Sequence, residues 1–155
     1  MPHPKFDRSR LLIKSLKERK NQISFPDKQI PLTFRPDNLK DQDKKLIQKT
    51  ARKIIIARQE KRPVILAFGA HAIKNGLGQV LIELIRKDWV THLATNEAGI
   101  IHDWEFAFQG KSGEDVRENV KNGQFGIWEE TGFLLIWQLL PGLLKDLVTG
   151  NQSGK

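Results

Sequence analysis

The sequence predicts an α/β fold in which a parallel sheet is flanked by helices. Residues 64–68, VILAF, form a continuous apolar run of the kind that is buried on both faces of a parallel sheet. Residues 77–85 then repeat apolar side chains at helical spacing, and residues 89–95 provide a second strand-like run. A strand, a helix and a strand with short connections between them predict a right-handed parallel crossover.

The remaining elements are predicted from periodicity and from residues typical of helix boundaries. They are an extended piece over 22–25 and helices over 41–61, 99–108 and 112–121. Asp41 or Asp43 is expected to cap the first of these helices, and Ser112 is expected to cap the last, because short polar side chains favour that position.

Composition divides the chain into three segments. Residues 1–38 contain five prolines and predict an extended arm, and residues 39–132 carry the predicted α/β domain. Residues 133–155, FLLIWQLLPGLLKDLVTGNQSGK, form an apolar tail with no clean helical face. Synonymous codons in a shifted reading frame allow this tail to encode an amphipathic helix and a Gly-rich turn. We therefore expect a frameshift near Gly132 and a truncated half of a larger, marginally stable domain.

Length and composition exclude several classes of protein. A chain of 155 residues has the size of one domain, and the lack of cysteine excludes disulfides and thiolate metal sites. The N-terminus lacks the apolar run of a secretory signal, and the longest apolar stretch is too short to span a bilayer. We expect a cytoplasmic protein with no membrane partner.

The positive charge is concentrated in the first part of the chain. Residues 1–62 carry 18 Lys and Arg against 7 Asp and Glu, whereas residues 63–155 carry 8 against 11. The simplest interpretation is a solvated helix face and a basic arm. Nucleic acid is not favoured, because no aromatic residues alternate with these charges. The alternative function is a non-catalytic module that docks nucleic acid or an acidic partner through this basic third.

Chemically capable residues gather in two turns that follow the predicted strands. The first turn contains glycines that would let a phosphate approach the backbone, with His71 and Lys74 beside them. The second turn contains Asn96 and several carboxylates that suit ribose hydroxyls, although Asn96 is also a candidate helix cap. No metal-binding spacing, nucleophile elbow or P-loop occurs, so we expect no metal site, and metalloprotease, serine hydrolase and NTPase functions lack support.

The run GAHAIKNGLGQVLIELIRKDWVTHLATNEAGIIHDWEFAFQGKSGEDV resembles the amino-terminal half of the deoxyhypusine-synthase-like proteins, which are NAD-binding Rossmann-type folds. It is also similar to the NAD-binding domain of the LOR/SDH-region ornithine cyclodeaminases. The resemblance covers residues 8–132 and is most specific over 69–78, 95–99 and 101–105. It implies a Rossmann-like sheet and a dinucleotide site lined by both turns. The residues implied as cofactor-binding are Gly69, Ala70, His71, Lys74, Asn75, Gly76, Asn96, Glu97, Ala98 and Gly99, with His102, Asp103 and Glu105 at the rim.

The sequence departs from authentic deoxyhypusine synthases in its second turn. It reads TNEAG over 95–99, where those enzymes have a TTAGG-like string. In those enzymes the lysine that attacks the spermidine-derived group lies in the second half, so no catalytic residue is carried over to this chain. The resemblance implies NAD as cofactor in an NAD-dependent transferase or oxidoreductase family, a homo-oligomer as a further possibility, and no activity of this chain alone.

Overall fold

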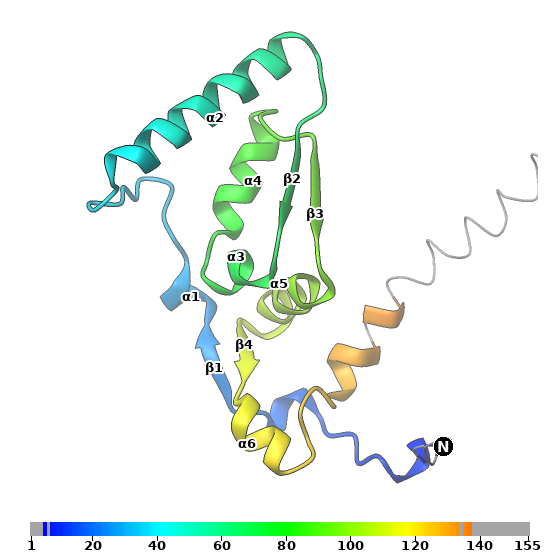
Figure 1. Ribbon diagram of the computed structural model, residues 1–155. Coiled ribbons are helices and arrows are strands. Elements are labelled where there is room, and N and C mark those ends of the chain that lie inside the picture. Colours follow the sequence, from blue (N-terminus) through cyan, green and yellow to red (C-terminus); the bar gives the residue numbers. More distant parts are fainter. Residues whose placement is uncertain (1–4, 6, 134, 138–155) are drawn as a thin grey trace, which may run out of the picture. The chain divides into compact units, whose positions relative to one another are not determined.

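The computed structural model describes residue 5, residues 7–133 and residues 135–137 (Figure 1). The chain forms two units, one of Ile23–Gly113 and one that combines Met1–Gln22 with Glu114–Lys155. The described part is a mixed α/β structure with two small sheets. None of its described helices is long and apolar enough to cross a membrane. Most of the apolar tail at 133–155, with the frameshift expected for it, lies outside the described residues.

The first half of the chain contains η1 Arg8–Arg10, η2 Leu16–Glu18, β1 Asn21–Ser24, α1 Phe25–Lys28, α2 Asp41–Gln59 and β2 Ile65–Phe68. The second half contains α3 Ala70–Lys74, α4 Gly78–Arg86, β3 His92–Thr95, α5 Glu97–Gln109, β4 Lys111–Glu114 and α6 Val116–Lys121. The predicted extended piece at 22–25 overlaps β1, which pairs with β4. The predicted strands and the helices at 41–61, 77–85 and 99–108 are confirmed with shifted ends.

The parallel pair predicted by the apolar runs is present in the larger unit. β2 pairs with β3 in parallel, in the register Leu66 to Leu93 and Phe68 to Thr95. One aspect of the prediction is wrong, because the pair is not buried on both faces. Ile65 is 66% exposed and every residue of β3 is exposed. Alternate side chains of β2 differ in burial: Ile65 and Ala67 are exposed, whereas Leu66 and Phe68 are half-buried.

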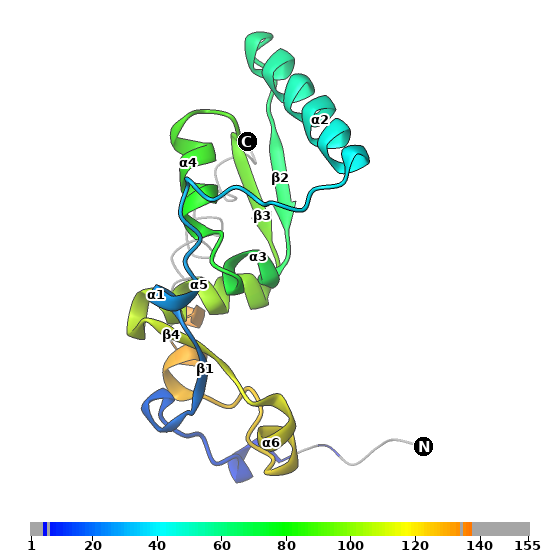
Figure 2. The same cartoon turned by 90° about the vertical axis from the view of Figure 1, so that its left-hand side faces the viewer.

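The core of the larger unit lies on the covered face of this pair. Ile23, Ile73, Leu81 and Phe106 are buried together, and Phe25, Leu66 and Phe68 pack against them. The α4 helix runs beside the strands in both views (Figures 1 and 2). These side chains come from β1, α1, β2, α3, α4 and α5, so the apolar cluster fixes the turns that follow both parallel strands.

Two predicted helix caps are wrong. The N-cap of α2 is Lys40, not Asp41 or Asp43. Both aspartates lie in the first turn of the helix, where their negative charge interacts favourably with the positive end of the helix dipole. Ser112 lies in β4 and is fully buried. Asp115 caps α6 instead, and its side chain accepts a hydrogen bond from the Glu118 N–H at 2.9 Å.

Hydrogen bonds to half-buried carboxylates hold the smaller unit together, both between its two chain segments and within the second of them. Glu130 accepts hydrogen bonds from the Ser15 hydroxyl at 2.6 Å and from the Leu16 N–H at 2.5 Å. Leu16 is fully buried, and the Trp128 indole N–H donates to Glu114 at 3.0 Å. Burial opposes the charge on Glu130, but hydrogen bonds from Ser15, from Leu16 and from its own backbone N–H, together with the Lys17 charge, outweigh burial and lower the pKa of this carboxyl below its usual value.

Candidate functional site

The two predicted turns meet at one edge of the parallel pair. Phe68 and Thr95 are register partners and are the last residues of β2 and β3. The next residues, Gly69 and Asn96, are the N-caps of α3 and α5. Parallel α/β sheets bind ligands beyond the carboxyl ends of their strands. The edge predicted to bind a ligand is therefore assembled as the sequence indicated.

A pocket of about 300 Å³ opens at this edge between α4, β3 and α5. Its walls are mostly apolar, and Thr95 and Asp103 contribute polar side chains. The lining residues are Phe68, Ile73, Gly78, Leu81, Ile82, Ile85, Leu93, Thr95, Gly99, Ile100 and Asp103. Of the thirteen residues predicted to bind the cofactor, only Gly99 and Asp103 line this pocket.

The second turn is closely packed at the start of α5. The Asn96 side chain accepts a hydrogen bond from the Gly99 N–H at 3.0 Å, so Asn96 acts as the helix cap that the sequence offered as the alternative interpretation. Gly99 is buried against Thr95, whose Oγ1 would lie 2.2 Å from a Cβ added at position 99. This glycine therefore allows α5 to begin close to the end of β3. Glu97 and Ala98 are exposed in the first turn of the helix.

The glycines of the first turn differ in the space beside them. Gly76 has φ 84°, and a Cβ there would lie 1.8 Å from the carbonyl oxygen of Lys28. The backbone at residue 28 thus occupies the side from which a ligand would approach Gly76. Gly69 and Gly78 differ, because a Cβ at either position would meet no atom within 4 Å. Open backbone for a ligand remains at these two glycines.

The charged residues of the first turn lie on the short helix α3. His71 and Asn75 are exposed, whereas Ala70 and Lys74 are half-buried. Ile73, between them, is buried in the core. Periodicity alone explains this division, because one side of α3 must pack on the core while the other faces water.

His102 and Glu105 are three residues apart and share one face of α5, and both reach Ser112 on β4. The His102 Nδ1 lies 2.6 Å from the Ser112 hydroxyl oxygen, which donates to the Glu105 carboxylate at 2.6 Å. A hydroxyl has one hydrogen to donate. With Glu105 ionised, that hydrogen serves Glu105, and His102 donates from Nδ1.

The Ser112 hydroxyl is not arranged as a nucleophile. Its side chain is fully buried, and Glu105 is 1% exposed. In an acyl-transfer triad the histidine lies between the serine and the carboxylate, whereas here the serine lies in the middle. The network joins α5 to β4 and places His102 and Glu105 on a face of α5 different from the one that carries Asp103 to the pocket.

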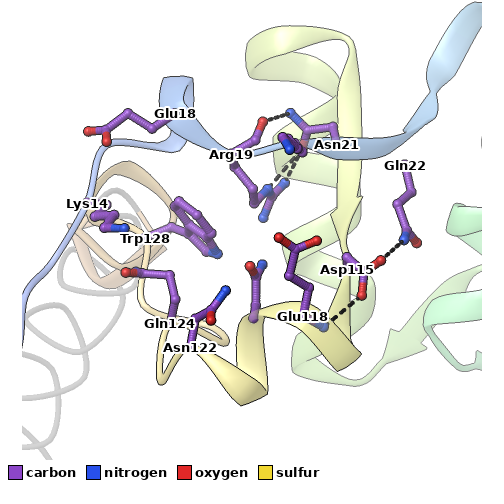
Figure 3. A pocket seen from close by; sticks show the side chains of 12 residues that line it. Lys14, Glu18, Arg19, Asn21, Gln22, Asp115, Glu118, Asn122, Gln124 and Trp128 are labelled. Atoms are coloured by element: carbon purple, nitrogen blue, oxygen red, sulfur yellow. Dashed lines mark hydrogen bonds between the residues drawn. The ribbon is translucent and has the colours of Figure 1, made fainter.

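A second pocket of about 280 Å³ lies within the smaller unit (Figure 3). The Arg19 guanidinium lies over the Trp128 ring, 5.6 Å from its centroid, and donates to the Asn21 side-chain oxygen at 2.9 and 2.7 Å. Asp115 accepts from Gln22 at 3.2 Å. Four of the polar side chains that line this pocket are thus engaged in pairs, Arg19 with Asn21 and Gln22 with Asp115. None of the predicted site residues lines it.

Sequence reasoning missed two features of these sites. The pocket has an apolar wall that includes Ile82, Ile85 and Leu93, and the sequence pattern identifies only a helix and a strand there. The sequence does not indicate the role of Ser112, since a serine before a helical pattern is typical of a helix N-cap. Within the described ranges, no group of three His, Asp or Glu side chains is placed to hold a metal ion.

Comparison of the chain with protein-family models, with curated proteins and with solved structures finds no match. The function of the edge beyond β2 and β3 therefore has to be inferred from its own geometry and from the residues that compose it.

Proposed function

We propose that this chain binds NAD beyond the carboxyl ends of β2 and β3, as a Rossmann-like, deoxyhypusine-synthase-like protein. One observation carries the proposal. The register of the parallel pair brings Phe68 and Thr95 together, so both predicted turns meet beside an open pocket at that edge. Such an edge is where open α/β sheets hold nucleotides.

Different residues at this edge suit the base, the ribose and the pyrophosphate of a dinucleotide. The apolar wall that includes Leu81 and Ile100 suits a flat base, and the Asp103 carboxylate suits ribose hydroxyls. Gly78, the first residue of α4, leaves room for a pyrophosphate near the free N–H groups of that helix. Gly76 does not serve this role, because the Lys28 carbonyl fills the space beside it.

The proposal concerns cofactor binding, and no residue of this chain is assigned to the transfer reaction. When bound, NAD would accept a hydride from an amine-bearing substrate, and the protein would contribute binding, orientation and electrostatics. His102 and Glu105 would act indirectly, since their contact with Ser112 fixes the orientation of α5 and therefore of Asp103.

Calorimetric titration with NAD, combined with thermal unfolding, tests the proposal. A ligand that binds only the folded state raises its stability by about 2.7 kcal/mol at a hundredfold excess over Kd. We expect a higher unfolding midpoint with NAD and weaker binding for Asp103→Asn. An unchanged midpoint at millimolar NAD contradicts NAD binding.

The matched glycine pair Gly78→Ala and Gly132→Ala locates the binding site. Neither added Cβ meets an atom within 4 Å, so both variants should fold. We expect Gly78→Ala to weaken NAD binding by about tenfold or more, because the methyl group blocks close approach to the helix N-terminus. Gly132→Ala, in the smaller unit, should bind as the unmodified chain does. Equal affinity of the two variants would place the phosphates elsewhere.

A further inference from the structure

The helix α2 is exposed over its length. It spans Asp41–Gln59, and none of its 19 residues is buried. Leu46 is 63% exposed, Ile47 54% and Ile55 41%. Single apolar side chains on a surface are ordinary, but a row of them on one helix marks an interaction surface.

The apolar residues of α2 form a stripe along one side. A shallow groove is lined by Leu46, Ile47, Thr50, Ala51 and Ile54. These positions are separated by three and four residues, which places them on one face of a helix. The stripe begins in the second turn of α2 and is continuous for more than two turns.

The basic residues of α2 form a separate face. A second groove is lined by Lys45, Gln48, Lys49, Arg52, Lys53 and Ile56. Lys53 follows Leu46 by seven residues, and Lys44 precedes Ala51 by seven, so these two lysines border the apolar stripe on its two sides. Lysines at such borders bury their apolar stems and keep the ammonium group in water.

The last turn of α2 is attached to the rest of its unit. The Arg58 guanidinium forms an ion pair with Asp88 and donates to the Asp88 and Arg62 carbonyl oxygens at 2.7 and 2.8 Å. These contacts fix the C-terminal end of the helix. The preceding turns, which carry the stripe and most of the lysines, are left to solvent.

We propose that α2 docks on the surface of an anionic lipid membrane. Leu46, Ile47 and the rest of the stripe would enter the boundary between headgroups and acyl chains, while the bordering lysines contact acidic headgroups. A helix of this kind lies in the membrane surface and does not span it. Such a surface helix is neither a spanning segment nor a secretory signal, which are the two features whose absence led to the expectation of no membrane partner.

The charge of α2 and its apolar stripe favour a lipid surface over nucleic acid or a second copy of α2 as the partner. Nucleic acid would neutralise Lys49 and Arg52 but would leave the apolar stripe in water. A second copy of α2 would cover the stripe, but it would bring the bordering lysines of two helices together, which is repulsive. An anionic membrane supplies both an apolar interior and negative charge, and the proposal is independent of NAD binding.

Flotation of the full chain with lipid vesicles tests the proposal. We expect binding to vesicles of phosphatidylcholine with phosphatidylserine, little binding to phosphatidylcholine alone, and release as salt is raised. Ile47→Asp and Lys49→Glu should each lower the bound fraction by about tenfold, through lost insertion and lost headgroup attraction. Both residues are exposed, so unchanged circular dichroism and unfolding midpoints should confirm that the variants fold.

Matched controls separate this surface from a general effect of charge. Val120→Asp and Lys111→Glu make the same types of change at exposed residues outside α2 and should bind vesicles as the unmodified chain does. Equal loss in these controls would overturn the assignment to α2. Equal binding to neutral vesicles, or no vesicle binding with salt-sensitive binding of an RNA oligonucleotide, would also overturn it. So would a dimer in light scattering that Ile47→Asp dissociates.

Discussion

The Ser112 hydroxyl donates a hydrogen bond to the Glu105 carboxylate over 2.6 Å, with both side chains closed off from solvent. A carboxylate removed from water is costly unless hydrogen bonds or opposite charge compensate it. Ser112 provides one such bond and links Glu105 to the Nδ1 of His102. The contact joins residues seven positions apart, on α5 and on β4, and so ties the helix that carries Asp103 to the second sheet.

We expect Ser112→Ala to destabilise the fold by about 1–3 kcal/mol, because Glu105 and His102 both lose the hydroxyl between them. Urea unfolding measures the change. Ser9→Ala removes an exposed hydroxyl that bonds to Asp7 and should alter stability by less than about 0.5 kcal/mol. A Ser112→Ala variant as stable as Ser9→Ala would show that the buried network contributes nothing.

Gly76→Ala should be among the most damaging substitutions in the larger unit. The new Cβ would lie 1.8 Å from the Lys28 carbonyl oxygen, at a φ of 84° that side chains disfavour. Backbone strain and overpacking each cost about 1–3 kcal/mol, so we expect a loss of at least ~2 kcal/mol in urea unfolding.

Gly69→Ala is the control for Gly76→Ala within the same turn. Its Cβ would meet no atom within 4 Å, and its φ is ordinary, so stability should change by less than about 0.5 kcal/mol. Equal losses in the two variants would mean that both glycines are needed for the turn itself, and would contradict the special role of the Lys28 contact.

Local pattern was enough to predict the parallel pair and the main helices, but it did not predict what surrounds them. Apolar runs place β2 and β3, and helical spacing places α4. The same runs gave the wrong burial, because exposure of Ile65 depends on whether another element covers that face. Fold class followed from periodicity, whereas coverage depends on tertiary packing.

Contacts distant in sequence shape the candidate site in ways that local pattern does not indicate. Gly76 was assigned to cofactor binding, yet a carbonyl from residue 28 lies against it, and nothing near position 76 signals that contact. Ser112 was assigned as a cap because the cap pattern is local, whereas its partners lie on α5. The features that could be predicted from the sequence are the positions of Asn96 and Gly99 and the meeting of the two turns. They depend on residues adjacent to the strands.

Glu130→Gln should change how stability depends on pH. The folded-state pKa of Glu130 is lowered, so its contribution is present above the unfolded-state value of about 4.3 and is lost as pH falls through the folded value. The variant should therefore be less stable than the unmodified chain at neutral pH, and the difference should shrink in acid. Urea unfolding at a series of pH values measures it.

Glu129→Gln is the neighbouring control, because that side chain is exposed. Glu129→Gln should lower stability at neutral pH by less than Glu130→Gln does. It should also leave the change of stability in acid as it is in the unmodified chain. A Glu130→Gln variant that differs from the unmodified chain by the same amount at all pH values would mean that the Ser15 and Leu16 contacts stabilise the amide as well as they stabilise the carboxylate.

Asn96 can be tested as a helix cap separately from its predicted role in binding NAD. Its side chain accepts from the Gly99 N–H at 3.0 Å, so Asn96→Ala should cost about 1 kcal/mol of stability, and Asn96→Asp should restore it. An added negative charge beside a pyrophosphate is repulsive, so Asn96→Asp should still weaken NAD binding if Asn96 lies near the cofactor. Thermal unfolding and NAD titration of the two variants separate these roles. If Asn96→Asp matches the unmodified chain in both measurements, Asn96 acts only as the cap of α5, and the phosphates do not lie at this turn.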